Sequence, residues 1–254
     1  MKILYGKNQI TEKPLYLERQ GAKSSCGFIV GRSRTGKTYF IKKEILSVLD
    51  AQNHVFVIHQ STEEKETEYT NWLRNIRNYG KSYDGVSFTC RTSEDVAKIE
   101  ISDKTKLVIF EIIATENTDD IYSAVIDKVW KLVKQNPSYS WIYFDEAELV
   151  FNHSCNAIEK ICQLSRLSRK ESFAVTCLFQ NADSFSCESA KPFFHNAGFA
   201  VFLSQDDESI KKESEIYQFP EDMKELLFNV SVAEGMILFG EKLIPFSFRN
   251  DGRK

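Results

Sequence analysis

The sequence predicts an α/β fold with a mostly parallel central sheet, and three observations lead to this fold class. Cys26–Val30 has the composition of a short buried strand, and apolar residues follow at helical spacing over residues 39–49. A second β-rich run over residues 54–58 comes where the next parallel strand is expected. A third apolar run, residues 141–144, ends in two carboxylates. We therefore predict helices on both faces of one sheet and antiparallel hairpins at its edges.

The segment between the first strand and the first helix carries the most specific pattern of the chain. Its residues are Gly31, Arg32, Ser33, Arg34, Thr35, Gly36, Lys37, Thr38 and Tyr39. Backbone N–H groups of such a loop converge on an anion at the helix N-terminus, and the two glycines permit the dihedrals that this requires. Lys37 is predicted to reach the β- and γ-phosphates of a nucleotide, and the Thr38 hydroxyl to ligate Mg²⁺. The pattern predicts the phosphate-binding loop of a nucleoside triphosphatase.

Two acidic residues and one amide extend this prediction to hydrolysis. Asp145 and Glu146 follow a buried strand, whose end delivers them to the ligand-binding edge of the sheet. Asp145 is predicted to hold Mg²⁺ through a water, and Glu146 to orient and deprotonate the attacking water. Gln180 follows the predicted strand Phe173–Phe179, where it would sense the γ-phosphate and place the lytic water. Acidic pairs after strands are common, so the phosphate loop upstream is what makes this pattern specific.

Three cationic or titratable positions have two interpretations each. Arg166 and Arg169 close a helix predicted over residues 156–170, where cations stabilise the helix dipole. Alternatively, one of them is an arginine finger that reaches the γ-phosphate of a neighbouring subunit. His59 ends the second strand, and it either lies exposed in a loop or faces the nucleotide, as Glu63 or Glu64 would.

We predict that the whole chain, residues 1–254, forms one domain. Within it, residues 1–22 form a small N-terminal β flap and residues 61–105 a reduced insertion, and periodicity and turn signals assign the remaining elements. Further helices are predicted over residues 63–78, 119–134, 191–196, 209–217 and 220–229. Further strands are predicted over residues 3–5, 15–17, 86–89, 106–110, 199–203, 235–239 and 242–246. The last two strands form a closing hairpin, which we expect at the sheet edge.

Composition places the chain among globular proteins of the cytoplasm. Hydrophobic residues make up 42% and charged residues 27% of 254 residues, and no apolar run is long enough to cross a bilayer. Six scattered cysteines without a CxxC pair predict reduced thiols. The net charge of −3 argues against capture of nucleic acid by the whole surface, although a local basic pore would not show in that total.

Six segments, in this order, resemble the conjugation and type IV secretion traffic ATPases: residues 5–11, 31–38, 141–146, 168–170, 179–181 and 235–246. The nearest likeness is to the C-terminal RecA-like motor domain of the VirB-type channel-assembly ATPase of Gram-positive integrative conjugative elements. The resemblance implies a RecA-like P-loop fold related to HerA and FtsK, with ATP and Mg²⁺ as cofactors. It also implies self-association, with a hexameric ring as one form, and channel proteins at the inner face of the cell membrane as partners. ATP rather than GTP rests on this likeness alone.

The chain departs from that family at three places. The second strand ends in His59 and Gln60, where the family has Asp-Pro, and no glycine-containing turn follows Lys170. The length leaves no room for the family's channel-docking domain and large helical insertion. We therefore expect either the motor part of a longer system that is split between polypeptides or a reduced relative with another role. A HerA- or FtsK-like DNA translocase and a nucleotide-binding scaffold with little hydrolysis are the alternatives. The presence of Glu146 and Gln180 argues against the scaffold.

Overall fold

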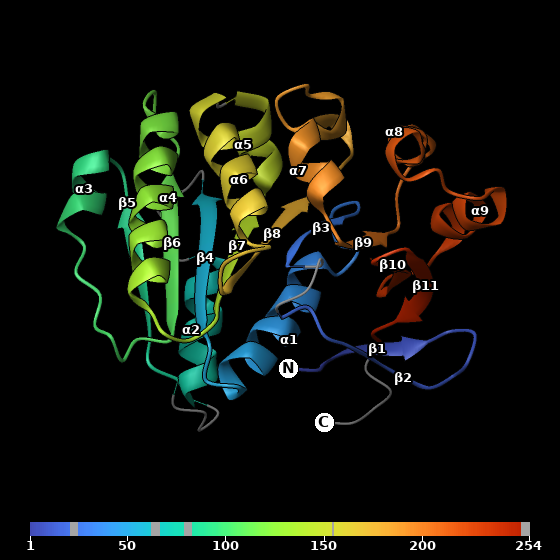
Figure 1. Cartoon of the computed structure of the whole chain (residues 1–254), viewed down its shortest axis with the longest axis horizontal. Helices are drawn as coiled ribbons and strands as arrows, with labels where there is room; N and C mark the ends of the chain where they lie inside the picture. The colour runs from blue at the N-terminus through green and yellow to red at the C-terminus, as the bar shows by residue number, and fades with distance from the viewer. Residues whose placement is uncertain (21–24, 62–66, 79–82, 154, 250–254) are drawn as a thin grey trace.

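The computed structural model describes residues 1–20, 25–61, 67–78, 83–153 and 155–249 (Figure 1). Its strands are β1 (Ile3–Asn8), β2 (Pro14–Leu17), β3 (Cys26–Val30), β4 (His54–Ser61), β5 (Gly85–Cys90), β6 (Leu107–Ile113), β7 (Ser140–Asp145), β8 (Phe173–Phe179), β9 (Phe199–Leu203), β10 (Glu234–Phe239) and β11 (Lys242–Ser247). Its helices are α1 (Lys37–Asp50), α2 (Glu68–Asn78), α3 (Ser93–Lys98), α4 (Thr118–Gln135), α5 (Ala147–His153), α6 (Cys155–Leu167), α7 (Lys191–Asn196), α8 (Asp207–Tyr217) and α9 (Glu221–Asn229), with a 3₁₀ turn at Asp183–Ser186.

All these strands join one sheet, in the order β2-β1-β11-β10-β9-β3-β8-β7-β4-β6-β5. Neighbours from β9 to β5 are parallel, and those from β9 to β2 are antiparallel. The predicted fold class is thus confirmed. The closing hairpin is not at the edge, however, because β11 pairs with β1 and β2 becomes the outer strand. Figure 1 shows this N-terminal hairpin beside the red C-terminal strands.

Alternation along the strands divides the core into two layers, one on each face of the sheet. In β7, Ile142 and Phe144 pack in the layer that holds α4, α5, α6 and α7. Trp141 and Tyr143 point to the other face, where α1, α2 and the β1–β2 hairpin pack. Asp145 continues the second set, so its side chain is directed to the face that α1 and α2 cover.

Several helix boundaries differ from the sequence prediction. The structure adds α3 and α5, which the pattern did not indicate; α3 begins at a capping box formed by Thr92 and Asp95. α6 ends at Leu167, and the residues up to 170 form a turn instead of a further helical segment. The predicted start of α2 at residue 63 lies outside the described residues. Among the described helices, none is long and apolar enough to cross a membrane.

A buried ion pair ties the N-terminal hairpin to the first helix. Arg19 is fully buried, and its Nη1 donates to Oε1 of Glu44 on α1 at 2.7 Å. Its Nη2 donates to Thr176 on β8 at 2.8 Å, and its guanidinium lies 3.9 Å from the centroid of the Phe199 ring. Tyr5 of β1 donates to the same Glu44 oxygen. Three separate segments therefore meet at one pair of charges beneath α1.

Replacing Arg19 by methionine is expected to destabilise the fold by about 3 kcal/mol or more, because the Glu44 carboxylate then remains buried without its cation. The matched control is Lys134→Ala, which breaks an ion pair with Glu171 whose side chains are 48% and 41% exposed. That control is expected to cost less than about 1 kcal/mol. Urea unfolding of both variants measures the difference, and equal losses would contradict a structural role for the buried pair.

Candidate nucleotide and metal site

The phosphate loop adopts a conformation that its glycines and one left-handed residue permit. Gly36 has φ 104° and Arg34 has φ 65°. At Gly31, an added Cβ would lie 2.7 Å from Cβ of Leu203, so no larger residue fits there without displacing β9. The Gly31 N–H donates to the Phe179 carbonyl at 3.2 Å, and the Arg32 N–H to the Ser204 carbonyl at 3.0 Å. The loop is therefore anchored at the carboxyl ends of β8 and β9.

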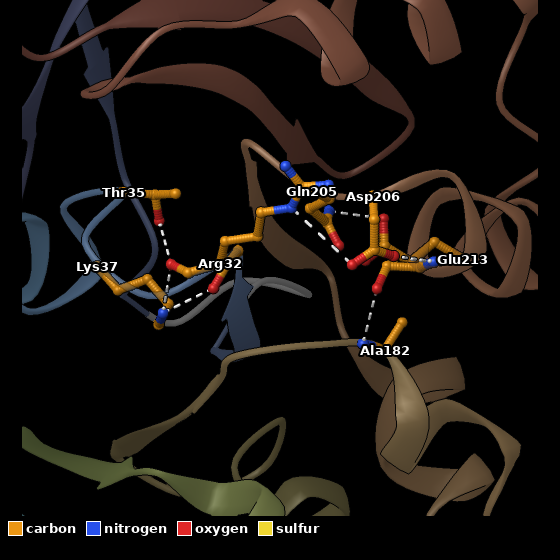
Figure 2. Close-up of polar contacts among 9 residues, drawn as sticks. Arg32, Thr35, Lys37, Ala182, Gln205, Asp206 and Glu213 are labelled. Atoms are coloured by element: carbon orange, nitrogen blue, oxygen red, sulfur yellow. Dashed lines mark hydrogen bonds and ion pairs between the residues drawn. The ribbon is translucent and has the colours of Figure 1, made fainter.

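Lys37 is held inside this loop. Its Nζ donates to the carbonyl oxygens of Gly31 at 2.6 Å and Arg32 at 2.9 Å, and the Thr35 hydroxyl donates to the Arg32 carbonyl at 2.8 Å (Figure 2). Burial lowers the pKa of Lys37, and the carboxylates of Glu148, Asp145 and Glu146 oppose this shift. A phosphate oxygen is a stronger acceptor than a carbonyl, so the ammonium can exchange these loop contacts for a phosphate.

The side chain of Arg32 points away from Lys37. Figure 2 shows it directed to the segment after β9, where its Nε lies 3.9 Å from Asp206, with both side chains about half exposed. Asp206 also caps α8 by accepting from the Ser209 N–H at 2.8 Å. Arg32 therefore supports the loop from outside and does not face the phosphates in this conformation.

A cavity of about 390 Å³ opens beside the loop and unites most of the predicted site. Its lining consists of Ser33, Arg34, Gly36, Lys37, Thr38, Tyr39, His59, Glu68, Asp145, Glu146, Leu178 and Gln180. Three residues that were predicted to bind the nucleotide do not line this cavity: Gly31, Arg32 and Thr35. Their hydrogen bonds fix the conformation of the loop. His59 lines this cavity as well, and a role toward the nucleotide stays a prediction. Glu63 and Glu64 lie outside the described residues.

The two carboxylates at the end of β7 are oriented differently. Asp145 is buried; its Oδ1 accepts from the Glu146 N–H at 3.0 Å, and its Oδ2 accepts from the Tyr69 hydroxyl at 2.8 Å. Glu146 has φ 53°, a left-handed conformation that turns the chain sharply after the strand. Burial raises the pKa of Glu146, with Asp145 adding to the rise and His59 and Lys37 opposing it. A raised pKa suits a carboxylate that accepts a proton from water.

The donors fit a magnesium ion with a bound nucleotide. Thr38 and Asp145 line the same cavity as Lys37 and supply the hydroxyl and carboxylate oxygens that Mg²⁺ prefers. Mg²⁺ usually completes its shell with phosphate oxygens and waters, so two protein donors beside a phosphate loop suffice. When bound, the ion would neutralise charge on the β- and γ-phosphates.

A second cavity, of about 360 Å³, adjoins the first at His59, Glu146 and Gln180 and contains a residue that sequence reasoning missed. His59, Gln60, Ser61, Glu146, Glu148, Leu149 and Gln180 line it. Burial raises the pKa of Glu148 to about 7, with Glu146 adding to the rise, and Oε2 of Glu148 accepts no hydrogen bond among the described residues. Glu148 lies in the first turn of α5, a helix that the sequence pattern did not indicate.

Glu148→Gln is expected to stabilise the nucleotide-free protein at pH 8 but not at pH 4.5. A carboxyl whose pKa rises from 4.5 to about 7 on folding favours the folded state when protonated. The free energy that the protonated Glu148 contributes to folding is fully present below pH 4.5 and is lost as the pH rises through about 7. A pKa shift of this size corresponds to a loss of up to ~3 kcal/mol. Thermal unfolding at both pH values measures the difference, and a stabilisation independent of pH would contradict this explanation.

Arg166 and Arg169 do not belong to the cavity of their own chain. Both are exposed, and Nη2 of Arg169 donates to the Asn196 carbonyl at 2.9 Å, just before β9 begins. They therefore lie near the amino ends of β8 and β9, whereas the phosphate loop and Gln180 lie at the carboxyl ends. Within one chain these arginines cannot reach the phosphates, and the finger in a neighbouring subunit stays a prediction.

Comparison with known proteins defines the class of fold. The chain has a mixed α/β fold with a large, mostly parallel sheet, which superposes on solved P-loop ATPase and NTPase structures and agrees with the fold class predicted from its motifs. No protein-family model matches the sequence, and no curated protein sequence matches it.

Solved structures provide the particular likenesses. VirB4 of Thermoanaerobacter pseudethanolicus superposes with a TM-score of 0.77 at 13% identity, covering 98% of this chain and 97% of that one. The genome packaging NTPase B204 of Sulfolobus turreted icosahedral virus 2, solved with ATP-γS, gives 0.61 at 14% identity, covering 89% and 98%. EssC (ATPases 2 and 3) from Geobacillus thermodenitrificans gives 0.56 at 14% identity, covering 97% and 40%. The predicted likeness to VirB-type motor domains is confirmed in the fold.

Proposed function

We propose that this protein is a Mg²⁺-dependent ATPase that powers a secretion or conjugative transfer apparatus. The observation that carries the proposal is that Lys37, Thr38, Asp145, Glu146 and Gln180 line one cavity. These residues come from three separate segments, and each has the chemical group that its predicted role requires. The complex of the similar NTPase B204 with ATP-γS supports a nucleotide as the ligand.

The reaction follows from the chemistry of these groups. The loop N–H groups and Lys37 hold the phosphates, while Thr38 directly and Asp145 through a water would hold Mg²⁺. Glu146 accepts a proton from the attacking water, while Gln180, exposed at the end of β8, orients that water and contacts the γ-phosphate. Charge that develops on the phosphoryl oxygens is stabilised by Lys37 and by an arginine from a neighbouring subunit, and a bound Mg²⁺ would add to this stabilisation.

The apparatus is proposed from the likeness to VirB4 and EssC. We infer self-association, with a hexameric ring as one form, and docking to channel proteins at the inner face of the cell membrane. In such an assembly Arg169 or Arg166 completes a neighbour's site. Their distance from the cavity of their own chain favours a role between subunits over a role within one.

A DNA translocase of the HerA and FtsK type is the second candidate. The likeness to the genome packaging NTPase B204 favours it. Binding of DNA that weakens steeply with added salt, together with ATPase stimulation by DNA, would support this candidate over channel assembly.

ATP turnover per subunit, measured over a series of protein concentrations, tests the proposal. Turnover that rises with concentration, and that falls in Arg166→Ala or Arg169→Ala at every concentration, supports a site completed by a neighbour. If turnover per subunit does not change with protein concentration and is the same in both variants, a neighbouring subunit does not complete the site with Arg166 or Arg169. A wild-type protein that binds ATP without hydrolysing it would contradict the ATPase itself and favour the scaffold.

A further inference from the structure

Polar side chains form a row across three neighbouring strands at the carboxyl edge of the sheet. His59 of β4 pairs in register with Glu111 of β6 and with Asp145 of β7. All three positions continue the side-chain set that faces α1 and α2. Asp145 is the predicted metal ligand, so this row leads from the metal site toward β5.

Hydroxyl groups of α2 and of the residue before it contact both ends of this row. Thr67 and Thr70 donate to the buried Glu111 carboxylate. Between them, Tyr69 donates to Oδ2 of Asp145 at 2.8 Å, and its side chain is only 1% exposed. Thr67 and Thr70, which flank Tyr69 in the chain, are thus both hydrogen-bonded to Glu111 and restrain the backbone that carries Tyr69.

The Tyr69 ring is also packed against the phosphate-binding half of the site. Its centroid lies 5.5 Å from that of His59, and Nζ of Lys42 on α1 lies 5.2 Å from it. Lys42 also pairs with Glu68, the first residue of α2, at 2.6 Å. The ring therefore contacts a side chain of α1, the helix that begins at the phosphate loop.

We propose that Tyr69 is a positioning residue that fixes the Asp145 carboxylate for Mg²⁺ and couples α2 to the metal site. This inference rests on the Mg²⁺-ATP site proposed above. The Glu146 N–H occupies one carboxylate oxygen and the Tyr69 hydroxyl the other, so rotation of the carboxylate is restrained from both sides. Each oxygen keeps a free lone pair for a metal-bound water.

Tyr69→Phe removes the hydroxyl and keeps the ring. Loss of a group that orients a metal ligand typically costs about 10- to 100-fold in metal affinity or activity. We expect the Mg²⁺ concentration for half-maximal ATP hydrolysis, and for half-maximal enhancement of ATP-γS binding, to rise by about 10-fold or more. Affinity for ATP-γS in EDTA is expected to stay at the wild-type value, because Asp145 acts on the phosphates only through the metal.

The matched control is Tyr139→Phe. This buried tyrosine donates to the Phe173 carbonyl at 3.0 Å, at the opposite edge of the sheet. It should lose similar stability without any change in Mg²⁺ dependence. In an Asp145→Asn background, Tyr69→Phe should add no further shift in the Mg²⁺ dependence of ATP-γS binding.

Two results would overturn the inference while leaving the proposed function intact. In one, Tyr69→Phe has the Mg²⁺ dependence of wild type. In the other it binds Mg²⁺ more tightly, which would mean that the hydroxyl competes with the metal for Asp145. If Mg²⁺ does not change the affinity of the wild-type protein for ATP-γS, both this inference and the proposed function are wrong. That result would be seen with the wild-type protein, before any variant is made.

Discussion

Glu146→Gln is expected to lower the rate of ATP hydrolysis by about 10²- to 10⁴-fold, the usual contribution of a general base. Glutamine has nearly the same shape but cannot accept the proton of the attacking water. The Glu146 N–H bond to Asp145 comes from the backbone and survives the substitution. Binding of ATP-γS with Mg²⁺ is therefore expected to stay within a few-fold of wild type, about the change that loss of one nearby charge allows.

Steady-state phosphate release and equilibrium binding measure the two effects separately. Glu188→Gln serves as the control, because this carboxylate is 84% exposed and pairs with Lys191, three residues away in the chain. Hydrolysis in Glu146→Gln at more than a tenth of the wild-type rate would assign the base to another group, and Glu148 in the adjoining cavity would be the first to test.

Lys37→Ala is expected to weaken ATP binding by about 10²-fold or more and to reduce hydrolysis further, since the ammonium also stabilises charge in the transition state. The free protein should remain folded. Lys37 is partly buried, and this burial disfavours the charged ammonium and lowers its pKa. Its loss removes two hydrogen bonds to loop carbonyls but also this unfavourable burial.

Isothermal titration with ATP-γS and thermal unfolding of the free protein test this pair of outcomes. Lys131→Ala, an exposed lysine of α4 on the other face of the sheet, is the matched control and should behave as wild type. Unchanged nucleotide affinity in Lys37→Ala would show that the phosphates bind elsewhere.

Much of the site was predictable because its groups follow buried strands directly. The loop after β3, the acids after β7 and Gln180 after β8 each come at the carboxyl end of an apolar run, and parallel pairing brings those ends to one edge. The face that each residue occupies also follows from alternation along the strand.

The remainder depends on contacts between distant segments. Nothing local in residues 67–78 indicates that Tyr69 bonds to Asp145, which lies 76 residues away in the chain. α5 went unrecognised because it is short and begins directly after the acidic pair, so Glu148 was missed with it. The hairpin of β10 and β11 was placed at the edge because the pairing of β11 with β1 spans almost the whole chain.

The most direct test of the central claim is a single-turnover experiment with excess protein, Mg²⁺ and ATP labelled at the γ-phosphate. If the cavity beside Lys37 and Glu146 is a hydrolytic site, wild-type protein will convert the bound ATP to ADP and labelled phosphate, and Glu146→Gln will retain it as ATP. Recovery of intact ATP from wild-type protein, at the same level as from the variant, would contradict the claim.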